Sequence, residues 1–261
     1  MKVFISSLVI VSALTACFPR ESLSEVNRDT PIKVAIIDTG LDLNDVRFKQ
    51  LCKTGHENFT AEPSTHHVDS MDTTDVQGHG THVAGLIQKY AGFNTDYCLL
   101  IYKFYSNSAS GKENLLNEAS AIRQAVREGA SIINISAGGA ESSEEEYAAI
   151  KNNPNVTFVV AAGNQGKNID DPKNKFYPAS YALKNEIIVG SVDSRWVRSP
   201  TSNYGSVVTD WEVGVGVLSY LNGPNLMGRL SGTSMATAIK TGKIVAARIF
   251  LCHSKNNKRK H

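Results

Sequence analysis

The chain has 261 residues, of which 41% are hydrophobic and 20% are charged. This composition excludes a fibrous repeat and a mainly disordered chain, and the length suits one large α/β domain whose core needs no metal or disulfide. The net charge is only +2, and much of the positive excess lies in the last seven residues, Lys255 to His261. A nucleic-acid-binding domain would carry a basic stripe through its fold, so no nucleic-acid partner is expected. We expect residues 253–261 to form a solvated basic tail.

The chain begins with the pattern of an export signal. Met1 and Lys2 precede an apolar run from Val3 to Leu14 that contains no charge. Its twelve residues (3 to 14) are too few to cross a bilayer as a helix, which takes about 20, but they suit the hydrophobic region of a secretory signal. The run ends in Leu14-Thr15-Ala16-Cys17. This ending resembles the lipoprotein box of bacteria, in which the signal is cleaved before the cysteine and the cysteine is acylated.

That resemblance implies a lipoprotein signal peptide over residues 1–16, lipidation of Cys17 (for example by palmitate) and a linker over residues 17–30. Two or three acyl chains would hold the protein stably on a membrane. We therefore expect an exported, membrane-anchored lipoprotein on the periplasmic or cell-surface side. The alternative is an ordinary signal peptide cleaved near Ala16, with Cys17 incidental.

Beyond the linker, short apolar runs alternate with helical patterns. Apolar residues from Leu115 to Val126 recur at helical spacing, and Gly129 ends that helix. Near-continuous apolar strands that alternate with helices predict a single α/β domain over residues 31–252, with a mostly parallel β-sheet covered by helices on both faces. The predicted strands are Ile32–Ile37, Leu99–Phe104, Ile132–Ile135, Val156–Ala162 and Ile187–Val192.

If Cys17 is acylated, three cysteines remain. Cys98 begins a predicted strand and Cys52 precedes that strand in the chain, so these two can pair across neighbouring strands in an oxidising compartment. An equally open alternative is that Cys52, Cys98 and Cys252 are all reduced and buried. None has the CxxC spacing of a redox or zinc site.

Three segments carry residues suited to nucleophilic catalysis. Acyl transfer needs a hydroxyl, a base that takes its proton, and an acceptor that orients the base. A carboxylate at a strand end, an imidazole that opens a helix and a serine that opens another helix can supply these groups. Because carboxyl ends of parallel strands share one edge, Asp38, Ser136 and Asn164 should gather there. The segments are Val34-Ala35-Ile36-Ile37-Asp38-Thr39-Gly40, Gly78-His79-Gly80-Thr81-His82-Val83-Ala84-Gly85 and Gly232-Thr233-Ser234-Met235-Ala236-Thr237-Ala238.

These segments resemble the signatures of the subtilisin family (subtilases) of serine peptidases, and they occur in that family's order Asp, His, Ser. A fourth segment, Val160 to Gly166, is similar to the strand and turn that hold the family's oxyanion asparagine. The likeness runs from about Ile32 to Leu251. It implies a subtilisin-like fold and a monomeric serine endopeptidase, a hydrolase acting on protein or peptide substrates.

By position, the resemblance makes Ser234 the nucleophile and His79 the general base and then acid. It makes Asp38 the partner of His79, and Asn164 the oxyanion donor. It also implies that a substrate strand pairs with the backbone of the cleft. The residues expected to line that cleft are Ser136, Ala137, Gly138, Gly139, Ala162 and Gly163.

Each motif alone has a simpler interpretation. Asp-Thr-Gly also occurs at ordinary strand-to-turn corners, and Gly-Thr-Ser can be a helix cap. His79 and His82 lack an HExxH pattern and an acidic third ligand, so no metal is assigned and His82 is interpreted as structural. No cofactor is expected. Calcium is common in the family and stays unassigned, because solvated surface charge is the commoner explanation of the acidic residues Asp42, Asp45, Asp69, Asp72 and Asp75.

Two segments depart from the family's pattern. Ala238 stands where proline usually ends the serine motif, and Trp211-Glu212-Val213-Gly214 replaces the usual Ala-Pro-Gly. We expect Glu212 to disturb the surroundings of Ser234. These changes favour a second hypothesis, a catalytically impaired subtilisin-like surface lipoprotein that binds peptides or a partner protein. Only 20 residues (18 to 37) separate Cys17 from Asp38, so we expect the domain to fold without a propeptide.

Overall fold

The computed structural model describes residues 30–60 and 70–257, except for the side chains of residues 255–257. The predicted signal peptide, the lipidation site Cys17 and the linker up to residue 29 lie outside the described residues. Within the described ranges, no helix combines the length and the apolar character needed to cross a membrane.

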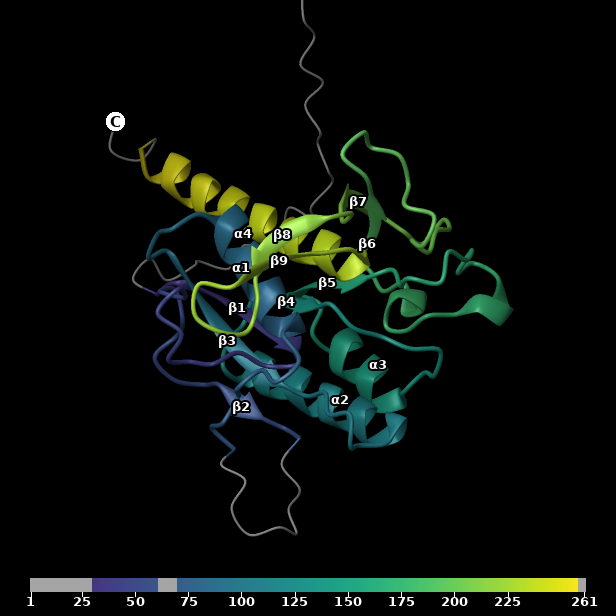
Figure 1. Cartoon of the computed structure of the whole chain (residues 1–261), viewed down its shortest axis with the longest axis horizontal. Helices are drawn as coiled ribbons and strands as arrows, with labels where there is room; N and C mark the ends of the chain where they lie inside the picture. Colours follow the sequence, from purple (N-terminus) through teal and green to yellow (C-terminus); the bar gives the residue numbers. More distant parts are fainter. Residues whose placement is uncertain (1–29, 61–69, 258–261) are drawn as a thin grey trace, which may run out of the picture.

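Within the described residues, seven strands form one sheet in the order β2-β3-β1-β4-β5-β6-β7, and every pair is parallel (Figure 1). Strand β1 pairs with β3 on one side and with β4 on the other. Its residues from Val34 to Ile37 are all buried, as expected for a strand covered on both faces. The strands are β1 Ile32–Asp38, β2 Glu57–Asn58, β3 Tyr97–Lys103, β4 Ile132–Ile135, β5 Thr157–Ala161, β6 Glu186–Val192 and β7 Asp210–Val213.

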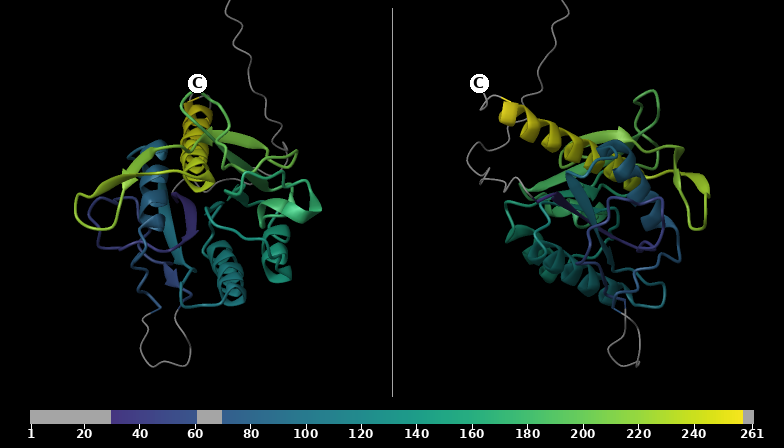
Figure 2. Two further views of the ribbon diagram at one scale, coloured as in Figure 1. Left: turned by 45° about the vertical axis from the view of Figure 1, so that its right-hand side comes forward. Right: turned by 90° about the vertical axis from the view of Figure 1, so that its left-hand side faces the viewer.

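Helices cover both faces of the sheet (Figure 2). On one face α1 (His79–Ala91) packs against α4 (Thr233–Asn257). The two helices approach so closely that a Cβ on Gly242 would lie 2.7 Å from the carbonyl oxygen of Ile87, which only glycine permits. On the other face α2 (Gly111–Arg127) and α3 (Glu144–Lys151) pack over a second apolar layer.

The start of α2 is set by a capping box. The Ser110 hydroxyl accepts the backbone N–H of Glu113, and the Glu113 carboxylate accepts the backbone N–H of Ser110. These two bonds satisfy N–H groups that have no acceptor inside the helix. The chain turns after the helix at Gly129, whose φ of 82° favours glycine.

The remaining described elements connect this framework. Strands β8 (Val217–Tyr220) and β9 (Met227–Leu230) form an antiparallel hairpin. The hydroxyl of Ser219 on β8 donates to the carbonyl oxygen of His82 on α1 at 2.8 Å, so the hairpin is tied to that helix. Two short 3₁₀ helices, η1 (Pro172–Asn174) and η2 (Ala179–Tyr181), lie between β5 and β6.

The predicted α/β class and the predicted parallel sheet are confirmed. The five predicted strands correspond to β1, β3, β4, β5 and β6, and their bounds differ from the prediction by no more than two residues. Helix α4 continues through Asn257, past the predicted domain boundary at residue 252. Residues 253–257, predicted to begin the basic tail, are therefore helical, and residues 258–261 lie outside the described residues.

Cys52 and Cys98 form a disulfide, with their Cα atoms 4.9 Å apart. This separation is well inside the limit of about 7 Å that a disulfide allows. Cys252 is free and exposed on α4. The alternative of three reduced, buried cysteines is therefore wrong.

Candidate active site

The site is assembled where strands β1, β4 and β5 end and helices α1 and α4 begin. Asp38 is the last residue of β1, Ser136 follows β4, and Asn164 lies in the loop after β5. The backbone N–H of Thr233, the first residue of α4, donates to Asn164 Oδ1 at 2.8 Å. The first residue of α1, His79, contacts Asp38. The predicted gathering of polar residues at one sheet edge is thus observed in the geometry.

Asp38 and His79 are in direct contact. Asp38 Oδ1 lies 2.7 Å from His79 Nδ1 and also accepts the backbone N–H of Thr39 at 2.7 Å. The carboxylate of Asp38 is only 2% exposed, whereas a third of the His79 side chain is exposed. The charge of Asp38 is the largest effect on the His79 pKa and raises it above its ordinary value, although burial opposes this. The ring is therefore held in one orientation with Nδ1 facing the carboxylate.

The start of α1 depends on Asp75, which the sequence placed among solvated surface acids. Asp75 is only 6% exposed, so that interpretation was wrong for this residue. Its carboxylate accepts the backbone N–H groups of Gly78 and Thr81, both at 2.8 Å, and so caps a helix whose N-cap glycine has no side chain. It also accepts the hydroxyl of Thr39 at 2.9 Å, and Thr39 accepts the N–H of Gly80. Asp75 thereby links the end of β1 to the helix that presents the imidazole.

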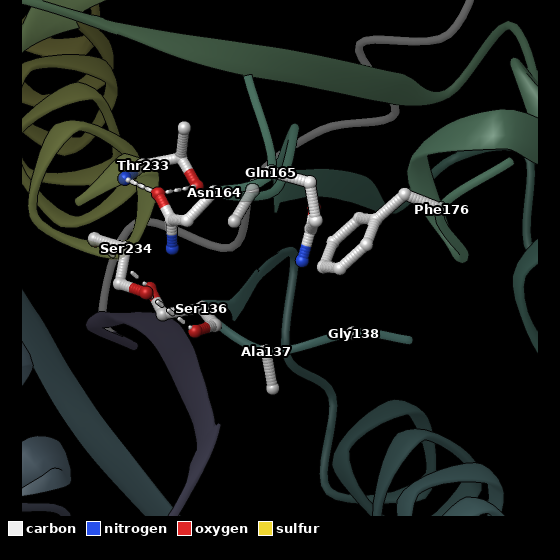
Figure 3. Close-up of a pocket in the computed structure, with 9 residues that line it drawn as sticks. Ser136, Ala137, Gly138, Asn164, Gln165, Phe176, Thr233 and Ser234 are labelled. Atoms are coloured by element: carbon white, nitrogen blue, oxygen red, sulfur yellow. Dashed lines mark hydrogen bonds between the residues drawn. The ribbon is translucent and has the colours of Figure 1, made fainter. Parts of the chain in front are cut away.

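Ser234 lies in the first turn of α4 and is 8% exposed. Its hydroxyl donates to the carbonyl oxygen of Ser136 at 2.8 Å (Figure 3). The helix dipole and the unpaired N–H groups of a first turn favour negative charge developing beside this side chain. The Ser234 hydroxyl must leave the Ser136 carbonyl before it can donate a proton to an imidazole.

The orientation of the Asn164 amide follows from its partners. Both the N–H and the hydroxyl of Thr233 donate to Asn164 Oδ1, at 2.8 and 3.2 Å. A backbone N–H can only donate, so the oxygen must face Thr233 and the amide nitrogen must face away. Figure 3 shows that nitrogen on the side of Ser234. A donor placed there can stabilise negative charge on an oxygen held near Ser234.

A pocket of about 160 Å³ opens beside Ser234 and Asn164. This volume is below the roughly 300 Å³ at which pockets for drug-sized ligands begin, so it suits a single side chain. Its lining residues are Ser136, Ala137, Gly138, Ala161, Asn164, Gln165, Phe176, Thr233 and Ser234.

Of the residues predicted to line the cleft, Ser136, Ala137 and Gly138 do line this pocket. Both backbone groups of Gly139 are paired with Tyr177, at 3.0 and 2.7 Å, so its N–H is not free for a substrate strand.

The pocket lining includes Ala161, not the predicted Ala162 and Gly163. The backbone groups of Ala162 and Gly163 bind within the fold, and both of their carbonyl oxygens accept from Asn203. Phe176 and Gln165 were not predicted as site residues. No sequence pattern marked Phe176, because it lies twelve residues beyond Asn164 in an irregular segment.

Two expectations about neighbouring residues can be compared with the structure. His82 is fully buried, and its Nε2 lies 3.1 and 3.2 Å from the carbonyl oxygens of Val217 and Gly228. Burial lowers the pKa of His82, which suits a neutral structural histidine.

Glu212 contacts Lys243 at 2.5 Å. Since Lys243 lies nine residues along α4 from Ser234 (243 minus 234), Glu212 pairs away from the nucleophile instead of disturbing it.

Among the described residues, no three His, Cys, Asp or Glu side chains form a group that could hold a metal ion. The side chains that the structure gathers at this edge are an acid, an imidazole, a hydroxyl and an amide. An acid–imidazole pair that shares one edge of a parallel sheet with a serine at a helix start is typical of α/β proteins that carry out nucleophilic acyl transfer.

The chain belongs to the subtilase family. The sequence profile of that family, Peptidase_S8, matches residues 29–250. The major intracellular serine protease of Bacillus subtilis (strain 168) is 35% identical over 231 residues, which cover 84% of this chain and 69% of the relative. Subtilisin-like protease 2 of Pseudogymnoascus destructans is 34% identical over 208 residues, which cover 78% of this chain. The chain spans about half the length (48%) of that relative.

Solved structures agree with the sequence relationship. The crystal structure of a cold-adapted subtilisin-like serine proteinase superposes with a TM-score of 0.64 at 29% identity, covering 80% of this chain and 72% of that one. The subtilisin-like fold expected from the motifs is thereby confirmed.

Proposed function

We propose that this chain is a serine endopeptidase that hydrolyses peptide bonds through an acyl-enzyme on Ser234. The observation that carries the proposal is the 2.7 Å contact between buried Asp38 and His79, at the same sheet edge as a serine in the first turn of a helix. An acid that orients an imidazole beside a hydroxyl is the arrangement that activates a serine nucleophile.

In the proposed mechanism, the Ser234 hydroxyl leaves the Ser136 carbonyl and gives its proton to His79 Nε2 as Oγ attacks the substrate carbonyl carbon. The carbonyl oxygen becomes an oxyanion, which receives hydrogen bonds from Asn164 Nδ2 and from the backbone N–H of Ser234. As the C–N bond breaks, His79 donates that proton to the leaving amine. A water molecule then gives a proton to His79 and attacks the acyl carbon. The bond from that carbon to Ser234 Oγ breaks, His79 returns the proton to Oγ, and the acid product leaves.

Asp38 keeps its negative charge throughout this sequence. It holds the tautomer of His79 that leaves Nε2 free to accept the serine proton, and it stabilises the imidazolium that follows. Asp75 acts through α1, because it fixes the first turn that carries His79.

We also propose that the chain is exported and anchored on a membrane by acyl groups on Cys17. The support is the position of Leu14-Thr15-Ala16-Cys17 directly after an uncharged apolar run. Metabolic labelling with an alkyne fatty acid tests this. The wild type should become labelled, and Cys17→Ser should not.

The test of the activity is peptide hydrolysis by residues 18–261 beside the Ser234→Ala variant. Cleavage by the first and not by the second is expected, together with labelling of the first alone by a fluorophosphonate. The binding-protein hypothesis is not favoured, because all four chemical residues are present and Asp38 contacts His79. It would gain if both folded proteins bound peptides and neither cleaved them.

A further inference from the structure

The far end of α4 presents apolar side chains to solvent. Phe250 is 71% exposed, Leu251 is 56% exposed, and the next residue, Cys252, is also exposed. Figure 1 shows this yellow end of the helix extending beyond the sheet. Another large apolar side chain, that of Phe93, is 68% exposed in the loop that joins α1 to β3. Exposed apolar side chains that gather at one end of a domain mark a surface that contacts a partner.

Two contacts place this helix end beside the point where the chain enters the fold. Nε2 of His253 lies 3.6 Å from Oδ2 of Asp96, which is in the same loop as Phe93. The carbonyl oxygen of Asp96 accepts the backbone N–H of Ile32, the first residue of β1, at 2.8 Å. The end of α4, this loop and the start of β1 therefore lie side by side. A chain anchored at Cys17 enters the fold at the same place.

This end of the molecule is opposite the active site. The guanidinium of Arg248 donates to the carbonyl oxygen of Ser131 at 3.2 Å and to the hydroxyl of Thr157 at 2.6 Å. Ser131 precedes β4 and Thr157 begins β5, so the last turns of α4 lie across the amino ends of these strands. Ser234 lies at the other edge, where the strands end. At about 1.5 Å per residue, the 16 residues from Ser234 to Phe250 (250 minus 234) span about 24 Å.

The same end of the chain is basic. The sequence from Val213 to His261 contains no Asp or Glu. Positive charge directly beyond exposed apolar residues of a helix is complementary to an anionic lipid surface, which takes up both kinds of side chain. A second copy of this chain would bring the same positive charge, and a soluble polyanion would leave the apolar side chains in water. The cationic residues that follow Leu251 are Lys255, Lys258, Arg259 and Lys260.

From this we propose that Phe93, Phe250 and Leu251, together with the four cationic residues, form a membrane-contact surface for anionic lipids. The proposal rests on the proposed anchoring at Cys17 for the choice of partner, and it adds the orientation of the domain. The apolar side chains enter the boundary between headgroups and acyl chains, while the cationic ones pair with lipid phosphates. Ser234 then faces the aqueous phase, so the substrates are soluble or surface-exposed peptides instead of segments embedded in lipid.

The experiment uses residues 18–261, which contain every described element and lack the predicted acylation site, with Ser234→Ala to prevent self-digestion. Because Cys52 and Cys98 are joined, Cys252 is the one free thiol of this protein, and it is labelled with an environment-sensitive dye. Vesicles of phosphatidylglycerol and phosphatidylcholine should bind the protein and shift the dye emission to the blue. Vesicles of phosphatidylcholine alone should bind at least about tenfold more weakly, because each Lys or Arg near an anionic surface strengthens binding about fivefold.

Two variants separate the apolar and the charged parts of the surface. Phe250→Ser should weaken co-sedimentation of the unlabelled protein with the anionic vesicles by about tenfold, because the variant loses an apolar side chain that lipid would bury. Lys258→Gln/Lys260→Gln should weaken it by about tenfold or more. The matched control is Trp196→Ser, which removes a 62% exposed aromatic side chain beyond the carboxyl end of β6. Its binding should equal that of the parent protein.

A dye on the other side of the molecule tests the orientation. In Cys252→Ser/Ser142→Cys the dye is attached at an exposed position between β4 and α3, and its emission should stay that of a dye in water. Equal blue shifts at the two positions would overturn the proposed orientation. Binding that Phe250→Ser leaves unchanged would overturn the surface itself, as would a dimer in the absence of vesicles that this variant dissociates.

The outcomes for this surface and for the anchor are distinct. Fatty-acid labelling of Cys17 without vesicle binding by residues 18–261 would overturn the membrane-contact surface and leave the anchor intact. Vesicle binding without labelling of Cys17 would support the surface and remove the anchor.

Discussion

Two buried carboxyl groups lie near each other where α2 packs against α3. Glu118 on α2 is 2% exposed and Glu146 on α3 is fully buried. One oxygen of each has no hydrogen-bond partner in the described part of the chain, while the other oxygen of Glu146 accepts the Tyr181 hydroxyl at 2.7 Å. Burial raises the pKa of Glu146 to about 7. Burial also raises the pKa of Glu118, with the charge of Glu146 as the next cause.

The perturbation that tests this pair is Glu146→Gln. The folded protein binds the Glu146 proton more tightly than the unfolded chain does, whose carboxyl titrates near 4.5. The protonated Glu146 carboxyl therefore contributes fully to the free energy of unfolding below pH 4.5, and this contribution is lost as the pH rises to about 7. At 1.36 kcal/mol per pH unit, the loss is about 2–3 kcal/mol between pH 5 and pH 8. Glutamine cannot ionise, so the variant escapes this loss.

The assay is urea unfolding followed by tryptophan fluorescence at pH 5, 6, 7 and 8, in a Ser234→Ala background that prevents self-digestion. The free energy of unfolding of the wild type should fall relative to Glu146→Gln by about 2–3 kcal/mol across this range. Glu144→Gln, an exposed position on the same helix, is the control and should parallel the wild type. Parallel curves for the wild type and Glu146→Gln from pH 5 to 8 would refute the reasoning.

Three further predictions concern the active site. The rate of hydrolysis should fall as the pH drops through the pKa of His79. The midpoint of this fall should lie above the ordinary histidine value of about 6.5, because Asp38 raises the pKa of His79. A flat rate from pH 5 to 8 would exclude His79 as the base. Asn164→Ala should lower kcat by about 10²–10³ with KM little changed, the range known for subtilisin's own oxyanion asparagine; equal turnover in steady-state assays would remove it from that role. Asp75→Asn should destabilise the fold by about 1–3 kcal/mol for each buried donor left unpaired, such as the N–H of Thr81, and urea unfolding at pH 7 measures this.

The sequence predicted the parts of the molecule that depend on local pattern. The strand that ends in Asp38 is a run of apolar residues because both of its faces are covered, and such a run is visible without any partner. His79 and Ser234 were found for the same reason, since each lies in a glycine-rich segment directly before or within a helix start. The order of these motifs along the chain was enough to indicate the family.

Contacts between distant segments could be known only from the tertiary structure. Asp75 looks like any acidic loop residue until the fold brings it under the first turn of α1. The disulfide joins residues 46 positions apart, and sequence alone left its formation open. Phe176 meets Gly138 only because β4 and the segment after β5 end at one edge of the sheet. Apolar periodicity thus determined where the strands and catalytic residues lie, whereas the shape of the pocket was decided by side-chain packing across the fold, which no local pattern records.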